Sequence, residues 1–396
     1  MRSVVTYTLS QCVKCMKCLR ACPTNAVFIQ KDRVHINHSR CINCGKCLDA
    51  CLNQGLQSKG STLVDISNYD YTVCLVPSSM ISDYKTHEQV EELFYAIKML
   101  GFDEVIDISD IEGQITKEAI LLSEIEHGKS LISSFCPVIN KLIEVKFPML
   151  LSSITAIDYA SEIAARQIRK RCTDKGKVGI FNCCECIAKL NLAKYPYGNS
   201  QFEVDHALAI VDIFPIIKAN MGKGKLPISL CKEGLQSCNP AMMMIAENHL
   251  VADGFDKVCN ILEHAEFGLL SEFDLLTLFP CFNGCLGGNL LWGNSYLTKN
   301  NIHQLCNVKE KSISNLPFEE IYGESTIDDV NDMRSIQERL VFFSKVNDQL
   351  EQLPGYDCGA CGFASCRIMA EEIATGKKTI QDCRIHRNEV KQNESK

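Results

Sequence analysis

The sequence predicts an α/β core of parallel sheets flanked by helices, with a small α+β module before it and a small, mostly helical module after it. Three observations support this division. Two regular cysteine runs fill the first 58 residues, alternating strand-like and helix-like segments follow from about residue 70, and a further cysteine group closes the chain. We therefore expect domains at residues 1–58, 59–345 and 346–396, with a linker around Gly60.

The N-terminal module contains two copies of one cysteine spacing. In each copy two residues separate successive members of a cysteine triplet, and a fourth cysteine follows after three more residues. Three thiolates at this spacing can wrap one [4Fe-4S] cubane, and the fourth cysteine of each run points at the other cluster. The predicted ligands of the first cluster are Cys12, Cys15, Cys18 and Cys51, and those of the second are Cys41, Cys44, Cys47 and Cys22.

This double pattern resembles the two-cluster bacterial ferredoxin module. Pro23 follows Cys22, whereas Leu52 follows Cys51, but neither position is a ligand. A disulfide framework would need an oxidising compartment and a secretion signal. Zinc seldom uses this spacing. Both alternatives are therefore weaker than an iron–sulfur module.

Cysteine is the unusual component of the composition, with 24 residues in 396. The N-terminus shows no apolar stretch typical of a secretory signal, and no apolar run reaches membrane-spanning length. So many thiols indicate an intracellular metal protein, and we expect a cytoplasmic location and an anaerobic source. The net charge of −7 argues against a nucleic-acid surface. The one basic stretch, from Arg166 to Lys177, is expected to be a solvated helix end rather than a docking patch for an acidic partner.

The middle of the chain alternates between strand and helix patterns. The predicted strands are Tyr71–Val76, Glu104–Ile108, Leu131–Ser134, Lys177–Phe181 and Phe273–Phe279. The predicted helices are Glu88–Leu100 and Ile115–His127, and residues 326–350 form a polar helical link to the C-terminal module. This alternation predicts a mostly parallel sheet, whose ligands bind beyond the carboxyl ends of its strands.

Three further cysteine groups follow strands of this predicted sheet. Cys136 comes after the Leu131 strand, Cys186 after the Lys177 strand, and the pair Cys281 and Cys285 after the Phe273 strand. Each group alone is weak evidence, because a cysteine beside proline is more often a small buried apolar residue. Together they place four thiolates at the strand ends of one sheet, which is what a third cubane needs.

In order and spacing, these groups resemble the three signature segments of the [FeFe]-hydrogenase catalytic domain, over about residues 70–310. In that family the segments bind the H-cluster, a cubane bridged by a thiolate to a diiron unit that carries CO and cyanide. The resemblance implies that Cys136, Cys186, Cys281 and Cys285 ligate the cubane, with Cys285 as the bridge. It also implies that Lys189 hydrogen-bonds a cyanide of the diiron unit.

The chain departs from this family at two places. Active members have a second cysteine just before the first-segment ligand, as the last proton donor to the diiron unit. Phe135 occupies that position here and carries no proton. In the second segment, Cys184 and Glu185 stand where the family has a small residue or methionine and then proline. We expect Cys184 and its neighbour Cys183 to be buried inert thiols, and Glu185 is the one acid that suggests a function.

The C-terminal module carries a fourth cysteine set, Cys358, Cys361, Cys366 and Cys383. The block LPGYDCGACGFASC resembles the small four-cysteine iron–sulfur domain of electron-transfer and corrinoid proteins. Zinc is a more serious alternative for this spacing. Some hydrogenase relatives join a ferredoxin module, an H-cluster-like domain and this domain in the same order. That subgroup is thought to be sensory, and it tends to lack the relay cysteine.

We therefore expect an iron–sulfur redox protein with three to four [4Fe-4S] clusters, and with the diiron unit as a further cofactor. The leading hypothesis is a low-activity or H2-sensing relative of [FeFe]-hydrogenase. Its expected partners are H2 and a redox protein such as ferredoxin or a signalling protein, with no nucleic acid and no membrane span. Whether it is an enzyme stays open, because Phe135 leaves at most weak hydrogenase activity with a ferredoxin-type acceptor.

Two other functions stay open from the sequence. One is a cubane-only electron carrier or iron–sulfur assembly scaffold without hydrogenase activity. The other is a full hydrogenase that uses a proton route through Cys184 or Glu185.

Overall fold

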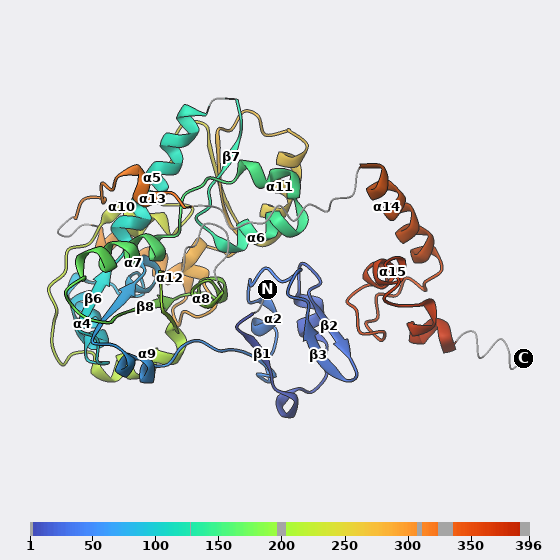
Figure 1. Ribbon diagram of the computed structural model, residues 1–396, viewed down its shortest axis with the longest axis horizontal. Coiled ribbons are helices and arrows are strands. Elements are labelled where there is room, and N and C mark those ends of the chain that lie inside the picture. The colour runs from blue at the N-terminus through green and yellow to red at the C-terminus, as the bar shows by residue number, and fades with distance from the viewer. Residues whose placement is uncertain (1–2, 127, 196–202, 307–310, 324–335, 389–396) are drawn as a thin grey trace, which may run out of the picture. The chain divides into compact units, whose positions relative to one another are not determined.

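The computed structural model describes residues 3–126, 128–195, 203–306, 311–323 and 336–388 (Figure 1). These residues divide into two compact units. One unit combines residues 1–58 with residues 329–396, and the other spans residues 59–328. The N-terminal and C-terminal cysteine modules therefore belong to the same unit. The predicted helix end at His127 and the start of the predicted 326–350 helix lie outside the described residues.

Two parallel sheets form the core of the larger unit. The strands of the first are β5 (Tyr71–Val76), β6 (Glu104–Asp107), β8 (Val178–Cys184) and β9 (His206–Ala209). Those of the second are β7 (Leu131–Ile132), β10 (His249–Asp253) and β11 (Leu275–Phe279). The strand orders are β6-β5-β8-β9 and β10-β11-β7, and all neighbouring strands are parallel.

Helices flank both sheets, as Figure 1 shows. The longer ones are α4 (His87–Lys98), α5 (Ser109–Ile125), α6 (Pro137–Lys146), α7 (Ala160–Arg171), α8 (Ile187–Lys194), α9 (Ile210–Asn220), α11 (Phe255–Glu266) and α12 (Ser295–Leu305). The shorter ones are α3 (Ser78–Ile81), α10 (Lys232–Ser237), α13 (Phe318–Ile321) and the 3-10 turns η2 (Leu63–Asn68), η3 (Pro148–Ser153) and η4 (Gly284–Gly287). The predicted α/β class of parallel sheets flanked by helices is confirmed.

A single helix shows how the pattern produces this packing. The apolar residues of α4 recur at helical spacing, and Val90, Leu93, Phe94 and Ile97 are all at most 1 % exposed. They pack in the same apolar cluster as Cys74 and Val76 of β5. The amphipathic face predicted for this helix therefore covers the four-stranded sheet.

The expectation that the core thiolates share one sheet is wrong. Cys136 and the Cys281–Cys285 pair follow β7 and β11 of the three-stranded sheet, whereas Cys186 follows β8 of the four-stranded sheet. The short strands β9 and β10, absent from the sequence prediction, give each sheet an extra edge strand.

Helix α5 begins at Ser109 instead of the predicted Ile115. The carboxylate of Asp107, at the end of β6, accepts hydrogen bonds from the Ser109 backbone N–H at 2.8 Å and from its hydroxyl at 2.7 Å. The backbone N–H groups of a first helical turn have no acceptor within the helix. Asp107 accepts that of Ser109, so the helix can start directly after the strand. This early start brings Glu112 into the buried first turn of the helix.

The smaller unit consists of short elements around cysteine loops. Its N-terminal part contains β1 (Val5–Tyr7), η1 (Leu9–Gln11), α1 (Lys17–Ala21), β2 (Val27–Gln30), β3 (Arg33–Ile36), α2 (Lys46–Asp49) and β4 (Leu56–Ser58). Strands β1 and β4 pair antiparallel, as do β2 and β3. Its C-terminal part contains α14 (Ile336–Glu351), α15 (Cys366–Ala374) and η5 (Ile380–Asp382).

Among the described residues, none of the helices is both long and apolar enough to cross a membrane.

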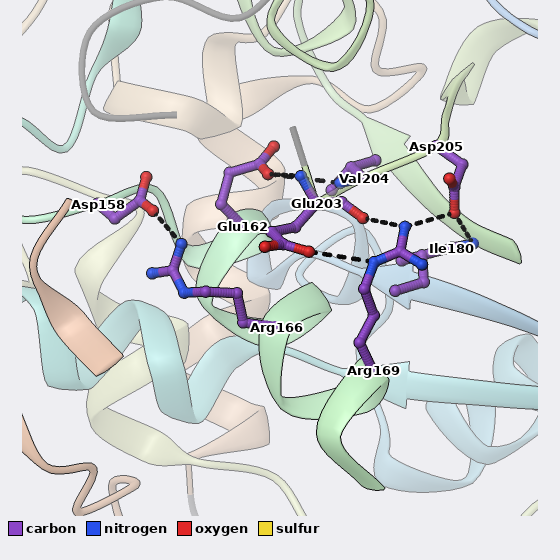
Figure 2. Close-up of polar contacts among 8 residues, drawn as sticks. All are labelled: Asp158, Glu162, Arg166, Arg169, Ile180, Glu203, Val204 and Asp205. Carbon is purple, nitrogen blue, oxygen red and sulfur yellow. Dashed lines mark hydrogen bonds and ion pairs between the residues drawn. The ribbon is translucent and has the colours of Figure 1, made fainter. Parts of the chain in front are cut away.

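The basic residues of α7 are paired with carboxylates (Figure 2). Arg166 contacts Asp158 at 2.5 Å, and only 14 % of the Arg166 side chain is exposed. Arg169 contacts Glu203 at 3.1 Å and Asp205 at 3.0 Å. The prediction of a solvated basic face is therefore wrong for Arg166, which neutralises a buried acid.

Glu162 on the same helix is buried without a cationic partner at hydrogen-bonding distance among the contacts drawn in Figure 2. Its carboxylate accepts the backbone N–H of Glu203 at 2.7 Å and that of Val204 at 3.4 Å, which holds the segment leading into β9. Burial raises the pKa of Glu162 to about 7, and it raises that of neighbouring Asp158 to about 6.

We predict that Glu162→Gln flattens the pH dependence of stability. The folded chain keeps the Glu162 proton up to about pH 7, whereas the unfolded chain releases it near pH ~4.3. The folded state therefore binds more protons in this window, and its stability falls as pH rises through it. Glutamine cannot ionise, so denaturant unfolding between pH 5 and 7.5 should show about 2 kcal/mol less pH dependence than the wild type.

The control for this prediction is Asp174→Asn, which changes an acid whose side chain is 74 % exposed. It should leave the pH dependence of unfolding as it is in the wild type. Equal slopes for Glu162→Gln and the wild type would contradict the assignment of this pH dependence to Glu162.

Candidate metal centres

The first N-terminal set of cysteines surrounds one cavity. Its lining includes all four predicted ligands, Cys12, Cys15, Cys18 and Cys51. Apolar residues, among them Ile29, Val34 and Leu56, close the rest of the wall. Lys14 and Met16 adopt positive φ angles of 56° and 62°, which turn the chain between successive cysteines.

The second N-terminal set surrounds a separate cavity. Its lining includes Cys22, Cys41, Cys44 and Cys47. Cys22 therefore lies with the second run although it ends the first, as the crossed arrangement predicts. Its Sγ accepts the backbone N–H of Ala26 at 3.1 Å. Burial raises the pKa of Cys44 to about 12, so an unligated Cys44 keeps its proton until a metal replaces it.

The C-terminal set surrounds a third cavity, lined by Cys358, Cys361, Cys366 and Cys383. Gly359 and Gly362 both have positive φ angles, 76° and 92°, in the loop that carries the first two cysteines. The carboxylate of Asp357 accepts the backbone N–H of Cys366 at 2.6 Å. Cys366 begins α15 and Cys383 directly follows η5, so a loop and two helix ends position this set.

The core cysteines lie on three segments that pack together. The second and third segments are joined by hydrogen bonds from Leu290 N–H to the Glu185 carbonyl at 2.9 Å and from Ile187 N–H to the Asn289 side chain at 3.2 Å. The first and third are joined by an edge-to-face contact between Phe135 and Phe279, with ring centroids 5.8 Å apart.

Two of the core cysteines cap helices. Cys136 precedes α6 and Cys186 precedes α8, and backbone N–H groups of the first turns favour their thiolates. Burial nevertheless raises the pKa of Cys186 to about 12, with smaller contributions from nearby charges that include Cys136. Cys285, which burial also keeps protonated in the absence of metal, lies within electrostatic range of Cys136. The geometry brings at least these three thiols to one place.

A small cavity lies next to the segments that carry Cys136 and Cys186, although no cysteine is among its lining residues. Its lining includes Phe135, Glu112, Glu185, Lys189 and Asn182. Phe135 is 8 % exposed, and the Lys189 ammonium lies 5.8 Å from the centre of its ring. The relay position of the first segment therefore faces this cavity with a hydrocarbon side chain.

Lys189 lies between two buried carboxylates. Its Nζ is 2.5 Å from Glu185 Oε1 and 3.7 Å from Glu112 Oε1. The side chains of Glu185 and Glu112 are 1 % and 2 % exposed. Burial alone would lower the pKa of Lys189, but these acids and Cys285 hold it well above its ordinary value. Lys189 is therefore a fixed cation that is already paired.

Glu112 was not anticipated from the sequence. It comes from the first turn of α5, and its Oε2 accepts the Ser78 backbone N–H at 3.1 Å. Burial raises its pKa. Nothing in the local sequence separates Glu112 from Asp110, the other acid of the first turn, and its partners Ser78 and Lys189 lie far away in the sequence.

The extra thiols of the second segment are buried, as expected. Cys183 and Cys184 are both 0 % exposed. The Cys183 Sγ lies 3.5 Å from the Cys74 Sγ within the apolar cluster of the four-stranded sheet. Burial raises the pKa of Cys184 well above its ordinary value, so this thiol keeps its proton.

The donor sets fit cubane clusters in chemistry. Four thiols surround each of three cavities, and thiolate is the ligand that iron–sulfur clusters use. The cavity beside the core cysteines fits a diiron unit only in part. Lys189 is present, and two buried polar atoms there, Asn182 Oδ1 and Glu185 Oε2, lack a hydrogen-bond partner in the described residues. The paired carboxylates, however, oppose an anionic ligand.

We predict that Glu185→Gln raises the reduction potential of the core cubane. A buried negative charge beside Cys186 disfavours adding an electron to the cluster, and its removal leaves Lys189 with Glu112 as its remaining acidic partner. Lys189→Met should shift the potential in the opposite direction. The measurement is a redox titration of the purified protein followed by EPR.

Glu112→Gln is the matched control for the Glu185 substitution, because the same change occurs farther from Lys189. It should produce a smaller positive shift. Equal potentials for all three variants and the wild type would mean that these charges do not act on the cluster.

Three family models match separate parts of the chain. Residues 73–233 match the family model described as iron only hydrogenase large subunit, C-terminal domain. Residues 11–54 match the 4Fe-4S dicluster domain, and residues 353–385 match a model for an Fe-S cluster domain. A search of the curated proteins found no match.

Solved structures show the same fold. Two variants of the [FeFe]-hydrogenase HydA1 from Chlamydomonas reinhardtii each superpose with a TM-score of 0.50 at 12% identity. Each alignment covers 66% of this chain and 97% of the algal chain. At this identity the likeness shows the fold alone. With the family matches, it identifies the chain as a hydrogenase-like iron–sulfur protein with a 4Fe-4S dicluster domain at residues 11–54 and an Fe-S cluster domain at residues 353–385.

Proposed function

We propose that this chain is a hydrogen-sensing or weakly active relative of [FeFe]-hydrogenase that passes electrons along four [4Fe-4S] clusters. The observation that carries the proposal is the position of Phe135. Its ring lies beside Lys189 at a cavity next to the segments that carry Cys136 and Cys186, where active hydrogenases have a proton-donating cysteine. The cysteines expected to bind the metal are present, whereas the residue at the relay position, Phe135, cannot donate a proton.

Slow proton delivery suits sensing better than turnover. A positioned proton donor contributes typically ~10²–10⁴-fold to a rate. Phe135 offers no proton, and the neighbouring thiols Cys183 and Cys184 lie in the buried core with no exposed surface. Binding of H2 needs no such relay, so a site of this kind can respond to the gas with little net conversion.

Three residues would meet a diiron unit in the bordering cavity. Such a unit supplies the iron centre at which hydrogen binds in the [FeFe]-hydrogenases. Lys189 would face its anionic ligands and Phe135 would exclude water from it, while Cys285, which lies within electrostatic range of Lys189, would hold it. Glu185 would hold the Lys189 ammonium in place at 2.5 Å.

The pairing of Lys189 also supports a second candidate function. An ammonium that already contacts two buried carboxylates has less to offer to a bound cyanide. The cavity would then stay without diiron, and the chain would be a cubane-only electron carrier or assembly scaffold. The expected partner in either case is a redox protein such as ferredoxin or a signalling protein.

Infrared spectroscopy separates the two candidates. The protein is produced with the hydrogenase maturases, purified without oxygen and measured in the stretching region of metal-bound CO and cyanide. We expect bands in this region that shift when H2 replaces an inert gas. Bands without any response to H2 would contradict sensing, and an empty region in a protein with full cubanes would establish the cubane-only carrier.

We predict that Phe135→Cys raises the rate of H2 turnover by roughly 10²-fold. The substitution restores a proton-carrying group to the cavity in place of a hydrocarbon ring. Proton–deuterium exchange and H2 oxidation with an artificial acceptor provide the measurement.

Phe135→Ala is the matched control, because it opens the same space without adding a proton donor. It should leave turnover close to the wild-type value. A similar gain in both variants would show that the bulk of Phe135 limits the site, and no gain in either would point to a missing diiron unit.

A further inference from the structure

Residues 336–388 pack against the N-terminal cysteine module within the smaller unit. The backbone N–H of Ile29 donates a hydrogen bond to the Gly362 carbonyl at 2.8 Å. Ile29 lies on β2, whose other edge pairs with β3. The C-terminal cysteine loop thus covers the free edge of this hairpin, which would otherwise expose unpaired backbone groups.

Side chains extend this contact on both sides of the loop. Phe28 stacks between His35 and Phe363, with ring centroids 5.4 Å and 6.3 Å away. It packs on the apolar cluster of the C-terminal part, which includes Val346, Leu353 and Ile368. Arg40 contacts Glu371 of α15 at 3.4 Å. The C-terminal module is therefore bound by backbone, aromatic and charged contacts together.

The contact brings two cysteine loops against each other. A Cβ on Gly359 would lie 3.2 Å from Met16 Sδ, and a Cβ on Gly362 would lie 2.1 Å from the Ile29 carbonyl oxygen. Both glycines flank Cys361, and Met16 stands between Cys15 and Cys18. Larger residues at these positions would force the loops apart, so the glycines permit this close approach.

The residues touched by the C-terminal loop belong to the first cluster site. Met16 and Ile29 line the cavity of Cys12, Cys15, Cys18 and Cys51. Neither residue lines the cavity of Cys22, Cys41, Cys44 and Cys47. Arg40 precedes a ligand of that second site, but its contacts are with α15 and not with the C-terminal cysteine loop.

We propose that the C-terminal cluster and the first N-terminal cluster form a directly coupled redox pair. The inference rests on the proposed function in that both cysteine sets must hold cubanes. One electron passes from a reduced [4Fe-4S]⁺ cluster to its oxidised [4Fe-4S]²⁺ neighbour, so the two exchange charge states and no bond or proton moves. Electron transfer weakens steeply as the distance between two clusters grows. A single layer formed by Met16, Ile29 and the two glycines separates the two cysteine loops, so electrons are expected to pass directly between their clusters. The redox state of the C-terminal cluster therefore follows that of the first N-terminal cluster and not that of the second.

EPR of the reduced full-length protein tests this pairing. Two paramagnetic clusters at close range broaden each other's signals and speed each other's spin relaxation. We expect Cys358→Ala with Cys361→Ala, which removes the C-terminal cluster, to slow relaxation of the first cluster severalfold. The second N-terminal cluster is present in all samples, so its contribution cancels in the comparison.

An undocking variant tests the geometry while every ligand is kept. Phe28→Ala with Arg40→Ala removes the aromatic and charged contacts, and faster hydrogen exchange at the Ile29 amide reports the separation. Relaxation of the first cluster should slow as in the cluster deletion, with unchanged iron content. Arg33→Ala is the control, because it removes an exposed cation of β3 that lines neither N-terminal cluster cavity.

Two results would overturn the inference, and iron analysis tells them apart. Unchanged relaxation after deletion of a C-terminal cluster that is full in the wild type would show that the two clusters are not coupled. A wild-type protein with no iron in the C-terminal set would overturn both the pair and the cluster assignment on which it rests.

Discussion

The ligation of buried thiolates is the constraint on which the rest of the structure depends. A cubane needs four thiolates around a bulky centre, and regular helices and strands cannot supply them from one short segment. Nine residues other than glycine have positive φ in the described chain, and seven of them lie within three residues of a predicted cysteine ligand. Each such conformation costs about 1–3 kcal/mol and persists only where its surroundings fix it.

Burial also holds free thiols in their protonated form, as at Cys44 and Cys186. Iron binding offsets both costs, so these loops and their clusters are expected to form together.

Charge around Lys189 distinguishes this core from that of an ordinary hydrogenase. The lysine is retained, yet Glu185 from its own segment and Glu112 from α5 both contact it in a buried site. Phe135 adds a hydrocarbon face where the family has a proton donor. Phe135 thus removes a proton-carrying group from the cavity, whereas Glu112 and Glu185 hold the Lys189 ammonium in place.

Local sequence patterns predicted many of the strands and the cysteine sets. Contacts between segments far apart in the sequence could not be predicted. Strand β5 was predicted at its observed bounds because a continuous apolar run ends at proline, and the cysteine spacings predicted which thiols share a cavity. Strands β9 and β10 each begin with a histidine and were missed, although they are as long as β6 and β11, which were predicted. The second sheet was missed with them. Glu112 and the docking of Gly362 on β2 depend on partners more than 30 residues away, which no local pattern records.

Mössbauer spectroscopy combined with iron analysis on anaerobically purified protein tests the central claim most directly. That claim is that four separate cysteine sets each hold a cubane within one chain. The account predicts about sixteen irons per chain in cubane form, since each full set contributes four, with any diiron unit adding to that number. Zinc in place of iron at the C-terminal set, or iron that fills only the two N-terminal sets, would contradict it.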